Sequence, residues 1–284
     1  MKANIKNIDL HMHTTMSDGT DTPTEIIEKV REAGITIFSV TDHDAINGCA
    51  VIQKALNGSD PAFITGAEFN CRDEGGRYHI LGYGYDPEAP AITKAVRTAH
   101  DLRMKKVHAR LDFLKEELGF ILPDEEIENL LALNNPGKPH IANLLVKYGY
   151  ADNKEQGIGY IDRKKFRSEY LHPHDVINAI KDSGGIPVLA HPPYGSGNEI
   201  IVRNDLSERV ERLTGMGLLG LEGYYSGYTK LLHDEVISLA DRFGLFVTAG
   251  SDYHGSNKLV ELGDTGPSDD VIADGLERFL SKIL

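Results

Sequence analysis

Hydrophobic positions along the chain fall into short runs rich in isoleucine, valine and leucine, and these runs alternate with amphipathic stretches. Such alternation is typical of βα units that build a mostly parallel sheet, so the pattern predicts an α/β fold. The runs predict strands at Ile5–Leu10, Ile35–Val40, Ala62–Ala67, His79–Tyr83, Ile186–Ala190, Leu218–Glu222 and Leu245–Ala249. The amphipathic stretches predict helices at Thr24–Ala33, Ala45–Leu56, His174–Ser183, Asp205–Thr214, Thr229–Phe243 and Asp269–Ile283.

The alternation breaks once, between about Pro87 and Arg167, where no segment has the pattern of a strand. We interpret residues 88–167 as a helical insertion that covers the active-site mouth, between the two parts of a discontinuous barrel domain, 1–87 and 168–284. A polar segment, NKEQGIGYIDRKK, is expected to follow the last predicted helix of the insertion. The helices predicted within it are Ala91–Leu118, Asp124–Leu133 and Pro139–Tyr148.

Composition narrows the classes of function. The chain has 284 residues, of which 40% are hydrophobic and 26% charged, as in ordinary globular proteins. Its formal net charge of -13 argues against stable binding of duplex nucleic acid through a broad basic face. A phosphorylated ligand therefore needs a local positive site. Cys49 and Cys71 form no CxxC pair, so neither a disulfide framework nor a thiolate zinc site is indicated.

The amino terminus, MKANIKNIDLHMHT, lacks the apolar run of a secretory signal. No later stretch has the length and apolar character of a membrane span. We therefore expect a cytoplasmic protein without a membrane partner. The exposed faces give no indication of an oligomeric state.

Histidine and carboxylate side chains gather where the predicted strands end, which is where βα-barrels and open α/β sheets place their sites. His11 and His13 follow the first strand, and a two-residue step along a strand points both imidazoles to the same side. Nearly all of the remaining predicted strands also have hard or borderline metal ligands at or near one end, in SDG, TDHD, GAE, YH, AHP, LEG and SDYH. Each could singly be a cap or a turn former, but their repetition at equivalent positions favours a metal site.

The motifs DLHMHT, SDG, TDHD, GAEF, YHILGY, AHP and SDYHG, in this order, resemble those of the PHP (polymerase and histidinol phosphatase) family. The resemblance extends from Asp9 to Gly255 and is interrupted by the insertion. It implies a distorted seven-stranded (β/α)7 barrel that binds up to three metal ions and hydrolyses phosphate esters.

The resemblance also implies which side chains hold the ions. A first ion would be bound by His11, His13, Glu68 and Asp252. Glu68 would bridge to a second ion, which also takes His79 and His191, and a third would lie on Asp18, His43 and His254. Imidazole mixed with carboxylate, without thiolate, suits Mn, Fe or Zn.

Three further carboxylates lie near these ligands. Asp42 is expected to point away from His43 and to support a ligand or cap a turn. Asp44 is expected to cap the start of the following helix. Glu222 has two interpretations, as a partner of a ligand or as a structural residue.

The hypothesis for the reaction is attack on phosphorus by a metal-bridging hydroxide, with no protein nucleophile. His191, Asp252 and His254 are the catalytic candidates for proton transfer, although each is first assigned as a ligand. Within the insertion, Lys138 and His140 open a predicted helix whose first-turn amides could bind a second phosphate. An ordinary helix start explains the same residues equally well.

The insertion and its KPHIA stretch most resemble the small bacterial family members that act on nucleoside 3′,5′-bisphosphates or trim short RNA from the 5′ end. The expected substrate is therefore a small phosphorylated molecule, a nucleotide or a short oligoribonucleotide. Histidinol phosphate phosphatase is the nearest alternative. Two other classes are a metal-dependent amidohydrolase acting on a non-phosphate substrate and an inactive binding module, and cleavage of an aryl phosphate with added Mn would separate these from a phosphoesterase.

Overall fold

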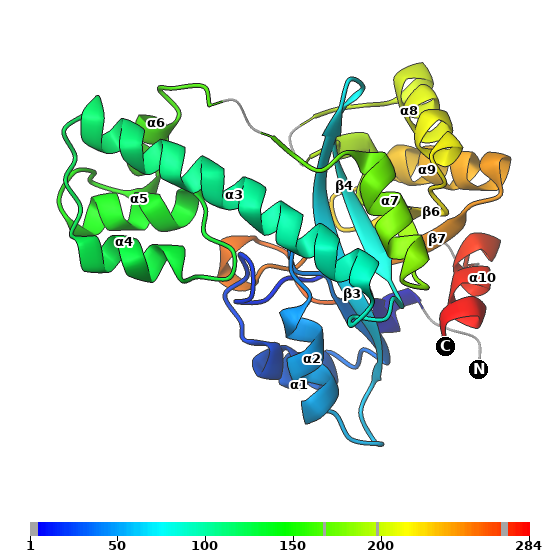
Figure 1. The fold of residues 1–284 in the computed structure, drawn as a ribbon. Helices are drawn as coiled ribbons and strands as arrows, with labels where there is room; N and C mark the ends of the chain where they lie inside the picture. The colour runs from blue at the N-terminus through cyan, green and yellow to red at the C-terminus, as the bar shows by residue number, and fades with distance from the viewer. Residues whose placement is uncertain (1–4, 167–168, 197–198, 268–271) are drawn as a thin grey trace. The chain divides into compact units, whose positions relative to one another are not determined.

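The structure is a computed structural model, and it describes residues 5–166, 169–196, 199–267 and 272–284 (Figure 1). Its strands are β1 (Ile8–Asp9), β2 (Ile37–Val40), β3 (Ala62–Asp73), β4 (Gly76–Tyr83), β5 (Ile186–Leu189), β6 (Gly220–Tyr225) and β7 (Phe246–Gly250). Its α-helices are α1 (Pro23–Glu32), α2 (Asn47–Ala55), α3 (Pro90–Glu116), α4 (Asp124–Leu131), α5 (Lys138–Lys147), α6 (Lys154–Ile161), α7 (Pro173–Asp182), α8 (Arg203–Gly215), α9 (Lys230–Phe243) and α10 (Asp274–Ile283). Three short 3-10 helices are η1 (Ile5–Asn7), η2 (Pro192–Tyr194) and η3 (Gly255–Asn257).

The seven strands form one sheet in the order in which they occur along the chain. The sheet is mostly parallel, as predicted, but β4 runs antiparallel to both β3 and β5. Only Glu74 and Gly75 separate β3 from β4, and two residues can connect antiparallel strands but not parallel ones. The reversal of β4 is therefore a consequence of this short hairpin.

The sheet curls until its first and last strands meet. The backbone N–H of Leu10 donates to the carbonyl of Ala249 over 2.8 Å, and the N–H of His13 donates to the carbonyl of Tyr253 over 2.8 Å. The result is a nearly closed barrel of seven strands with helices around it. The prediction of a distorted seven-stranded α/β barrel is confirmed.

Several predicted boundaries are wrong. β3 continues to Asp73, so Glu68 lies within the strand and not at its end. β1 is only two residues long, because Ile5–Asn7 forms a 3-10 turn in front of it. The polar segment after α5 contains a helix, α6, whose first turn is capped by the side chain of Asn153 accepting from the N–H of Gln156.

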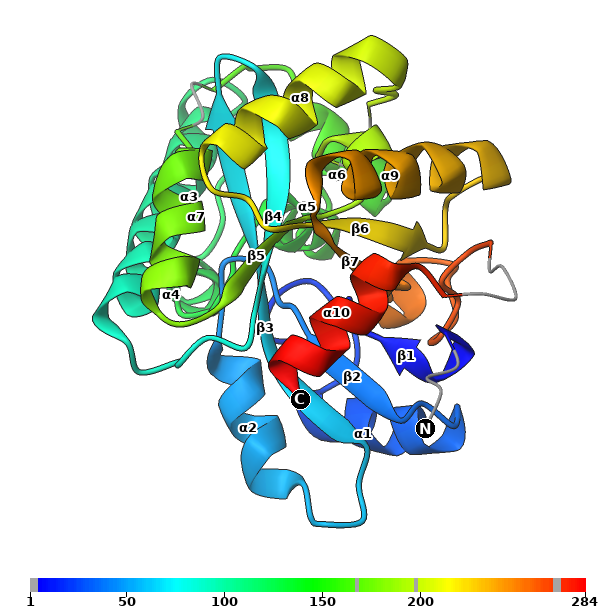
Figure 2. The ribbon, with the colours of Figure 1, turned by 90° about the vertical axis from the view of Figure 1, so that its right-hand side faces the viewer.

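Helix α10 packs at the end of the barrel where β7 begins, as Figure 2 shows. The Phe279 ring is fully buried, with its centroid 5.5 Å from that of Tyr83 and 6.1 Å from that of Phe246. Because β7 starts and the antiparallel β4 stops at this end, α10 covers the end opposite the carboxyl ends of the parallel strands. The predicted start of this helix, Asp269, lies outside the described residues.

The chain divides into two compact units, residues 1–96 with 171–284 and residues 97–170. The first contains the barrel. The second contains α4, α5, α6 and most of α3, and its core includes Val107, Leu114, Ile141, Leu145 and Ile161. The predicted junction between the insertion and the barrel, at residues 167 and 168, lies outside the described residues. In the described part of the chain, no helix combines the length and the apolar character needed to cross a membrane.

Candidate metal centre

All nine side chains predicted as ligands gather at one end of the barrel, around Glu68. The segments that carry them are separate in sequence and are brought together by the sheet. His11 and His13 follow β1, and His43 follows β2. Glu68 lies on β3, His79 on β4, His191 after β5, and Asp252 and His254 after β7, while Asp18 lies on the loop between β1 and α1.

Glu68 is 1% exposed and lies among five imidazoles. Three of these rings lie near one carboxylate oxygen and two lie near the other. Oε1 faces Nε2 of His11 at 3.4 Å, Nδ1 of His79 at 3.0 Å and Nε2 of His191 at 3.3 Å. Oε2 faces Nε2 of His13 at 3.3 Å and Nδ1 of His43 at 3.0 Å. A carboxylate with both oxygens so placed can bridge two cations.

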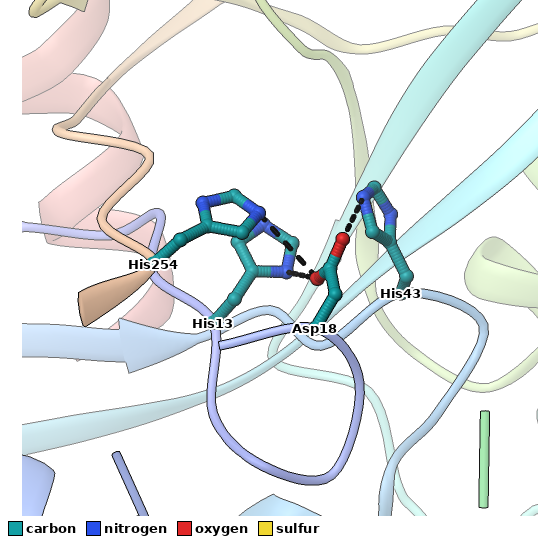
Figure 3. Close-up of side chains that lie close together, drawn as sticks. All are labelled: His13, Asp18, His43 and His254. Carbon is teal, nitrogen blue, oxygen red and sulfur yellow. Dashed lines mark ion pairs between the residues drawn. The ribbon is translucent and has the colours of Figure 1, made fainter. Parts of the chain in front are cut away.

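A second group surrounds Asp18, with His13, His43 and His254 around its carboxylate (Figure 3). Oδ1 of Asp18 lies 3.4 Å from Nε2 of His254 and 3.6 Å from Nδ1 of His13. Oδ2 lies 3.8 Å from Nε2 of His43. Their candidate ligand atoms all lie within 4.8 Å of one another, which is close enough for one ion to contact all four.

Asp252 uses its two oxygens differently. Oδ1 lies 3.5 Å from Nε2 of His11, 3.4 Å from Nε2 of His13 and 3.4 Å from Nδ1 of His254. Oδ2 accepts a hydrogen bond from the hydroxyl of Tyr225 over 2.8 Å and contacts Nζ of Lys258. One oxygen thus faces the imidazoles while the other is held from outside the group.

The buried atoms of this cluster fit metal ions. Nε2 of His11, Nε2 of His13 and Oε1 of Glu68 are buried and have no hydrogen-bond partner among the described residues. Buried polar atoms are nearly always paired, so orphaned ones need an explanation. Here they all point at the same place, and each is a nitrogen or oxygen of the kind that binds divalent transition metals.

Glu222 orients two of these ligands. Its Oε1 lies 2.8 Å from Nδ1 of His11, and its Oε2 accepts from the backbone N–H of His191 over 2.7 Å. A carboxylate on Nδ1 favours the tautomer that carries its proton there, which leaves Nε2 of His11 with a lone pair toward Glu68. Of the two interpretations of Glu222, the contacts favour the partner of a ligand.

The contacts of Asp42 agree with its prediction, whereas those of Asp44 do not. Asp42 points away from the imidazoles and accepts hydrogen bonds from the N–H and hydroxyl of Thr14 and from the hydroxyl of Ser17. The prediction for Asp44 is wrong, because α2 begins only at Asn47. Its carboxylate instead accepts from the N–H of Asn70 over 3.0 Å and so ties the loop after β2 to β3.

The backbone is strained at this end of the barrel. Four non-glycine residues among those described have positive φ, and three of them belong to this region: Asp44 at 52°, His191 at 29° and Asp252 at 60°. Such conformations cost about 1–3 kcal/mol each and concentrate at functional sites. Gly250 is needed for close packing, because a Cβ there would lie 2.2 Å from Cβ of His11.

At Glu68 and His11, electrostatic interactions within the cluster outweigh the effect of burial on the pKa. Burial alone raises the pKa of Glu68, but His79, His43 and His11 hold it well below its ordinary value. Burial lowers the pKa of His11, but Glu222, Glu68 and Asp252 raise it well above its ordinary value. The site therefore keeps its carboxylates ionised and attracts positive charge, and bound cations would compete with protons for the imidazoles.

The PHP domain pattern matches residues 9–214 of the chain. The chain belongs to the PHP domain family. The match covers most of the predicted ligands, and the structure places Asp252 and His254, which follow β7, in the same cluster.

Curated relatives of this PHP protein act on phosphate esters. A phosphoribosyl 1,2-cyclic phosphate 1,2-diphosphodiesterase from Eggerthella lenta is 29% identical over 87% of the chain and 94% of its own length. A 5′-3′ exoribonuclease from Haemophilus influenzae is 28% identical over 96% of the chain and 99% of its own length. A 3′,5′-nucleoside bisphosphate phosphatase from Chromobacterium violaceum is 28% identical, with 87% of each chain covered.

A solved structure from Bifidobacterium adolescentis, assigned as a metal-dependent phosphoesterase, superposes with a TM-score of 0.80. It is 26% identical and covers 98% of this chain and 96% of its own. The predictions of a PHP family member and of a metal-dependent phosphoric ester hydrolase are confirmed at the level of family and reaction class.

Two residues of this PHP site were missed by sequence reasoning, Tyr225 and Lys258. Both contact Asp252, but Tyr225 is the last residue of β6 and Lys258 follows η3, so neither belongs to a motif with ligand chemistry. The sequence signal for them was weak: Tyr225 lies at the carboxyl end of a strand, and Lys258 lies a few residues beyond Asp252 and His254. The predicted substrate-binding residues are engaged within the second unit: Nζ of Lys138 lies 2.7 Å from Asp162, and Nδ1 of His140 accepts from the N–H of Gly137.

Proposed function

We propose that this PHP phosphoesterase removes the 3′-phosphate of nucleoside 3′,5′-bisphosphates or releases nucleotides from the 5′ end of short RNA. The observation that carries the proposal is the set of imidazoles and carboxylates gathered on both oxygens of Glu68. The named activities of the Chromobacterium violaceum and Haemophilus influenzae relatives support the substrate class. The net charge of -13 supports a small substrate over stable binding of a duplex.

The proposed cofactors are up to three divalent ions of Mn, Fe or Zn. The first would be held by His11, His13, Glu68 and Asp252, the second by Glu68, His79 and His191, and the third by Asp18, His43 and His254. His43 also lies close to Glu68 and His79. When bound, such ions supply an activated water and stabilise charge on the phosphoryl oxygens. The absence of thiolates and the mixture of imidazole with carboxylate support this choice of metals.

The chain's own residues hold this chemistry in place. Glu222 fixes the His11 ring and the backbone of His191, so their ligand atoms stay aimed at Glu68. Asp252 has a positive φ of 60°, and its Oδ1 faces three imidazoles of the cluster. His191, Asp252 and His254 stay the candidates for proton transfer, and each lies beside the proposed ions.

Substrate selection is proposed to come from the insertion, residues 88–167. Lys138 and His140 open α5, and Pro139 lies in its first turn, as expected for a helix start that offers amides to an anion. Lys138 has three ammonium donors, so its pairing with Asp162 leaves capacity for a phosphate.

A second candidate is cleavage of a cyclic phosphate diester. The Eggerthella lenta relative, which shares 29% identity over most of both chains, supports it. The same cluster could serve both reactions, because ions that stabilise a phosphoryl group do so in monoesters and diesters alike.

The test compares substrates on the Mn-loaded protein. Turnover would be measured in parallel on adenosine 3′,5′-bisphosphate, 5′-phosphorylated oligoribonucleotides, phosphoribosyl 1,2-cyclic phosphate, histidinol phosphate and an aryl amide. We expect the largest kcat/KM on the bisphosphate or the oligoribonucleotides. A clear preference for any of the other three would contradict the proposed substrate, and cleavage of the amide alone would contradict the reaction class in this chain.

Two controls guard against a contaminating phosphatase. The EDTA-treated protein should lose turnover and regain it on addition of Mn. The variant His11→Ala, purified in the same way, should show no turnover at any Mn concentration that saturates the wild type.

A further inference from the structure

Lys258 brings a positive charge to the edge of the metal centre. Its Nζ contacts Oδ2 of Asp252 and lies 3.0 Å from the hydroxyl of Tyr225, which in turn donates to the same Oδ2 over 2.8 Å. The ammonium also lies 5.3 Å from the centre of the Tyr225 ring. Neither Lys258 nor Tyr225 is among the side chains predicted to bind metal.

The segment that carries Lys258 is fixed to the site by two hydrogen bonds. The N–H of Ser256 donates to the hydroxyl of Thr20 over 3.0 Å, and the side chain of Asn257 donates to the carbonyl of Asp18 over 2.8 Å. Both partners lie on the loop that contributes Asp18 to the cluster. Lys258 is therefore held at a defined place beside the proposed ions.

The geometry leaves part of the ammonium available. A lysine ammonium has three N–H donors, and Asp252 and Tyr225 take two of them. The side chain of Lys258 is 34% exposed, whereas that of Asp252 is only 10% exposed. The remaining donor thus belongs to a group that solvent, and a ligand entering from solvent, can reach.

A phosphoryl group is the ligand that this arrangement fits. The group is anionic and offers several acceptor oxygens, and charge-assisted hydrogen bonds to such oxygens are among the strong ones. In an acidic protein of net charge -13, a lysine fixed next to Asp252 supplies local positive charge where a phosphate ester must approach.

We propose that Lys258 is a substrate-binding residue whose ammonium contacts the phosphoryl group being hydrolysed, with Tyr225 positioning it. The proposal rests on the phosphoesterase function proposed above. It differs from a purely structural role, in which Lys258 would only neutralise Asp252 and so support metal binding.

The variant Lys258→Gln tests this directly. Isothermal titration of the Mn-loaded protein with inorganic phosphate should give a Kd raised roughly 10- to 100-fold, the usual loss for a charge-assisted hydrogen bond. KM for the preferred substrate should rise by a comparable factor, with a smaller change in kcat. Lys258→Arg should keep phosphate affinity close to that of the wild type.

Metal content, measured on each variant, separates the two roles. Lys258→Gln with full metal content and weakened phosphate binding supports the proposal. Unchanged phosphate affinity, or loss of metal with normal phosphate affinity in the loaded fraction, would overturn it. The matched control is Lys181→Gln, because Lys181 is exposed near the end of α7 that precedes β5, at the opposite end of the barrel.

The titration also distinguishes failure of this inference from failure of the proposed function. If the wild type hydrolyses no nucleotide, the proposed substrate is wrong. A dependence of phosphate affinity on Lys258 would still stand in that case, since inorganic phosphate is bound without turnover.

Discussion

Glu222 is the residue on which the aim of the metal ligands most depends. It is fully buried, and each of its oxygens is committed, one to the His11 ring and one to the backbone N–H of His191. Partners of this kind fix both the ring orientation and the tautomer of a metal-binding histidine. A residue outside the predicted ligand set can thus hold together two ligands that follow different strands.

The variant Glu222→Gln should weaken metal binding. An amide has one acceptor oxygen where the carboxylate has two, so either His11 or His191 loses its partner. We expect the affinity for Mn to fall roughly 10- to 100-fold and the free energy of unfolding to fall by about 1–3 kcal/mol. Titration with Mn, followed by thermal unfolding, measures both effects.

The matched control is Glu208→Gln on α8, an exposed glutamate outside the cluster, which should change neither quantity. Unaltered Mn affinity in Glu222→Gln would show that His11 and His191 are oriented without it.

For single residues, the sequence predicts which side chains can bind a metal better than it predicts which side chains contact one another. The spacing of His11 and His13 predicts that both imidazoles point to the same side, and the ligands at the other strand ends turn this pair into a predicted metal site. Nothing local predicts that Tyr225 reaches Asp252, 27 positions away, or that Glu222 reaches His11, 211 positions away. Those contacts depend on which strands become neighbours when the barrel closes.

At the scale of elements, the reversed strand β4 shapes the site. Parallel strands present their carboxyl ends to the metal centre, but β4 runs the other way, so His79 reaches the same place from the first half of its strand. Helix α10 covers the opposite end and buries Phe279 between Tyr83 of β4 and Phe246 of β7. Apolar packing therefore closes the barrel at one end, and the predicted metal ligands lie at the other.

The variant Phe279→Ala should affect stability, which depends on the packed end of the barrel, without affecting the metal centre at the other end. The ring is fully buried, so Phe279→Ala should lower the free energy of unfolding by about 3–5 kcal/mol through lost burial and the cavity left behind. Metal content and kcat/KM of the folded variant should stay near those of the wild type. Denaturant unfolding and metal analysis measure the two properties.

The control is Leu231→Ala, since Leu231 is 81% exposed and its truncation should change stability by no more than about 0.5 kcal/mol. Full stability in Phe279→Ala, or loss of metal without loss of stability, would contradict this division of the barrel.

Most elements follow from hydrophobic periodicity, and the exceptions have physical reasons. The pattern places a strand at His79–Tyr83 but carries no sign of its direction, which the two-residue turn at Glu74 and Gly75 determines. α6 escapes prediction because Gly157 and Gly159 weaken its helical pattern, and packing outweighs that propensity: Ile161 is fully buried in the core of the second unit. β3 extends beyond its apolar run because β4 pairs with it as far as Asp73.

At the scale of the whole molecule, an acidic protein binds and hydrolyses acidic substrates. The chain carries a net charge of -13, and three of the carboxylates counted in it, Asp18, Glu68 and Asp252, lie at the site. Three divalent ions would reverse the sign of the local charge, and Lys258 would add to it. We therefore expect phosphate binding to depend on the ions, whose charge would offset that of the three carboxylates.

The most direct test is a crystal structure of the Mn-loaded protein with anomalous data collected at the manganese edge. We expect anomalous peaks within coordination distance of both oxygens of Glu68, with His11, His13 and Asp252 around one of them and His79 and His191 around another. Side chains that diverge, with no anomalous density between Glu68 and these histidines at saturating Mn, would contradict it.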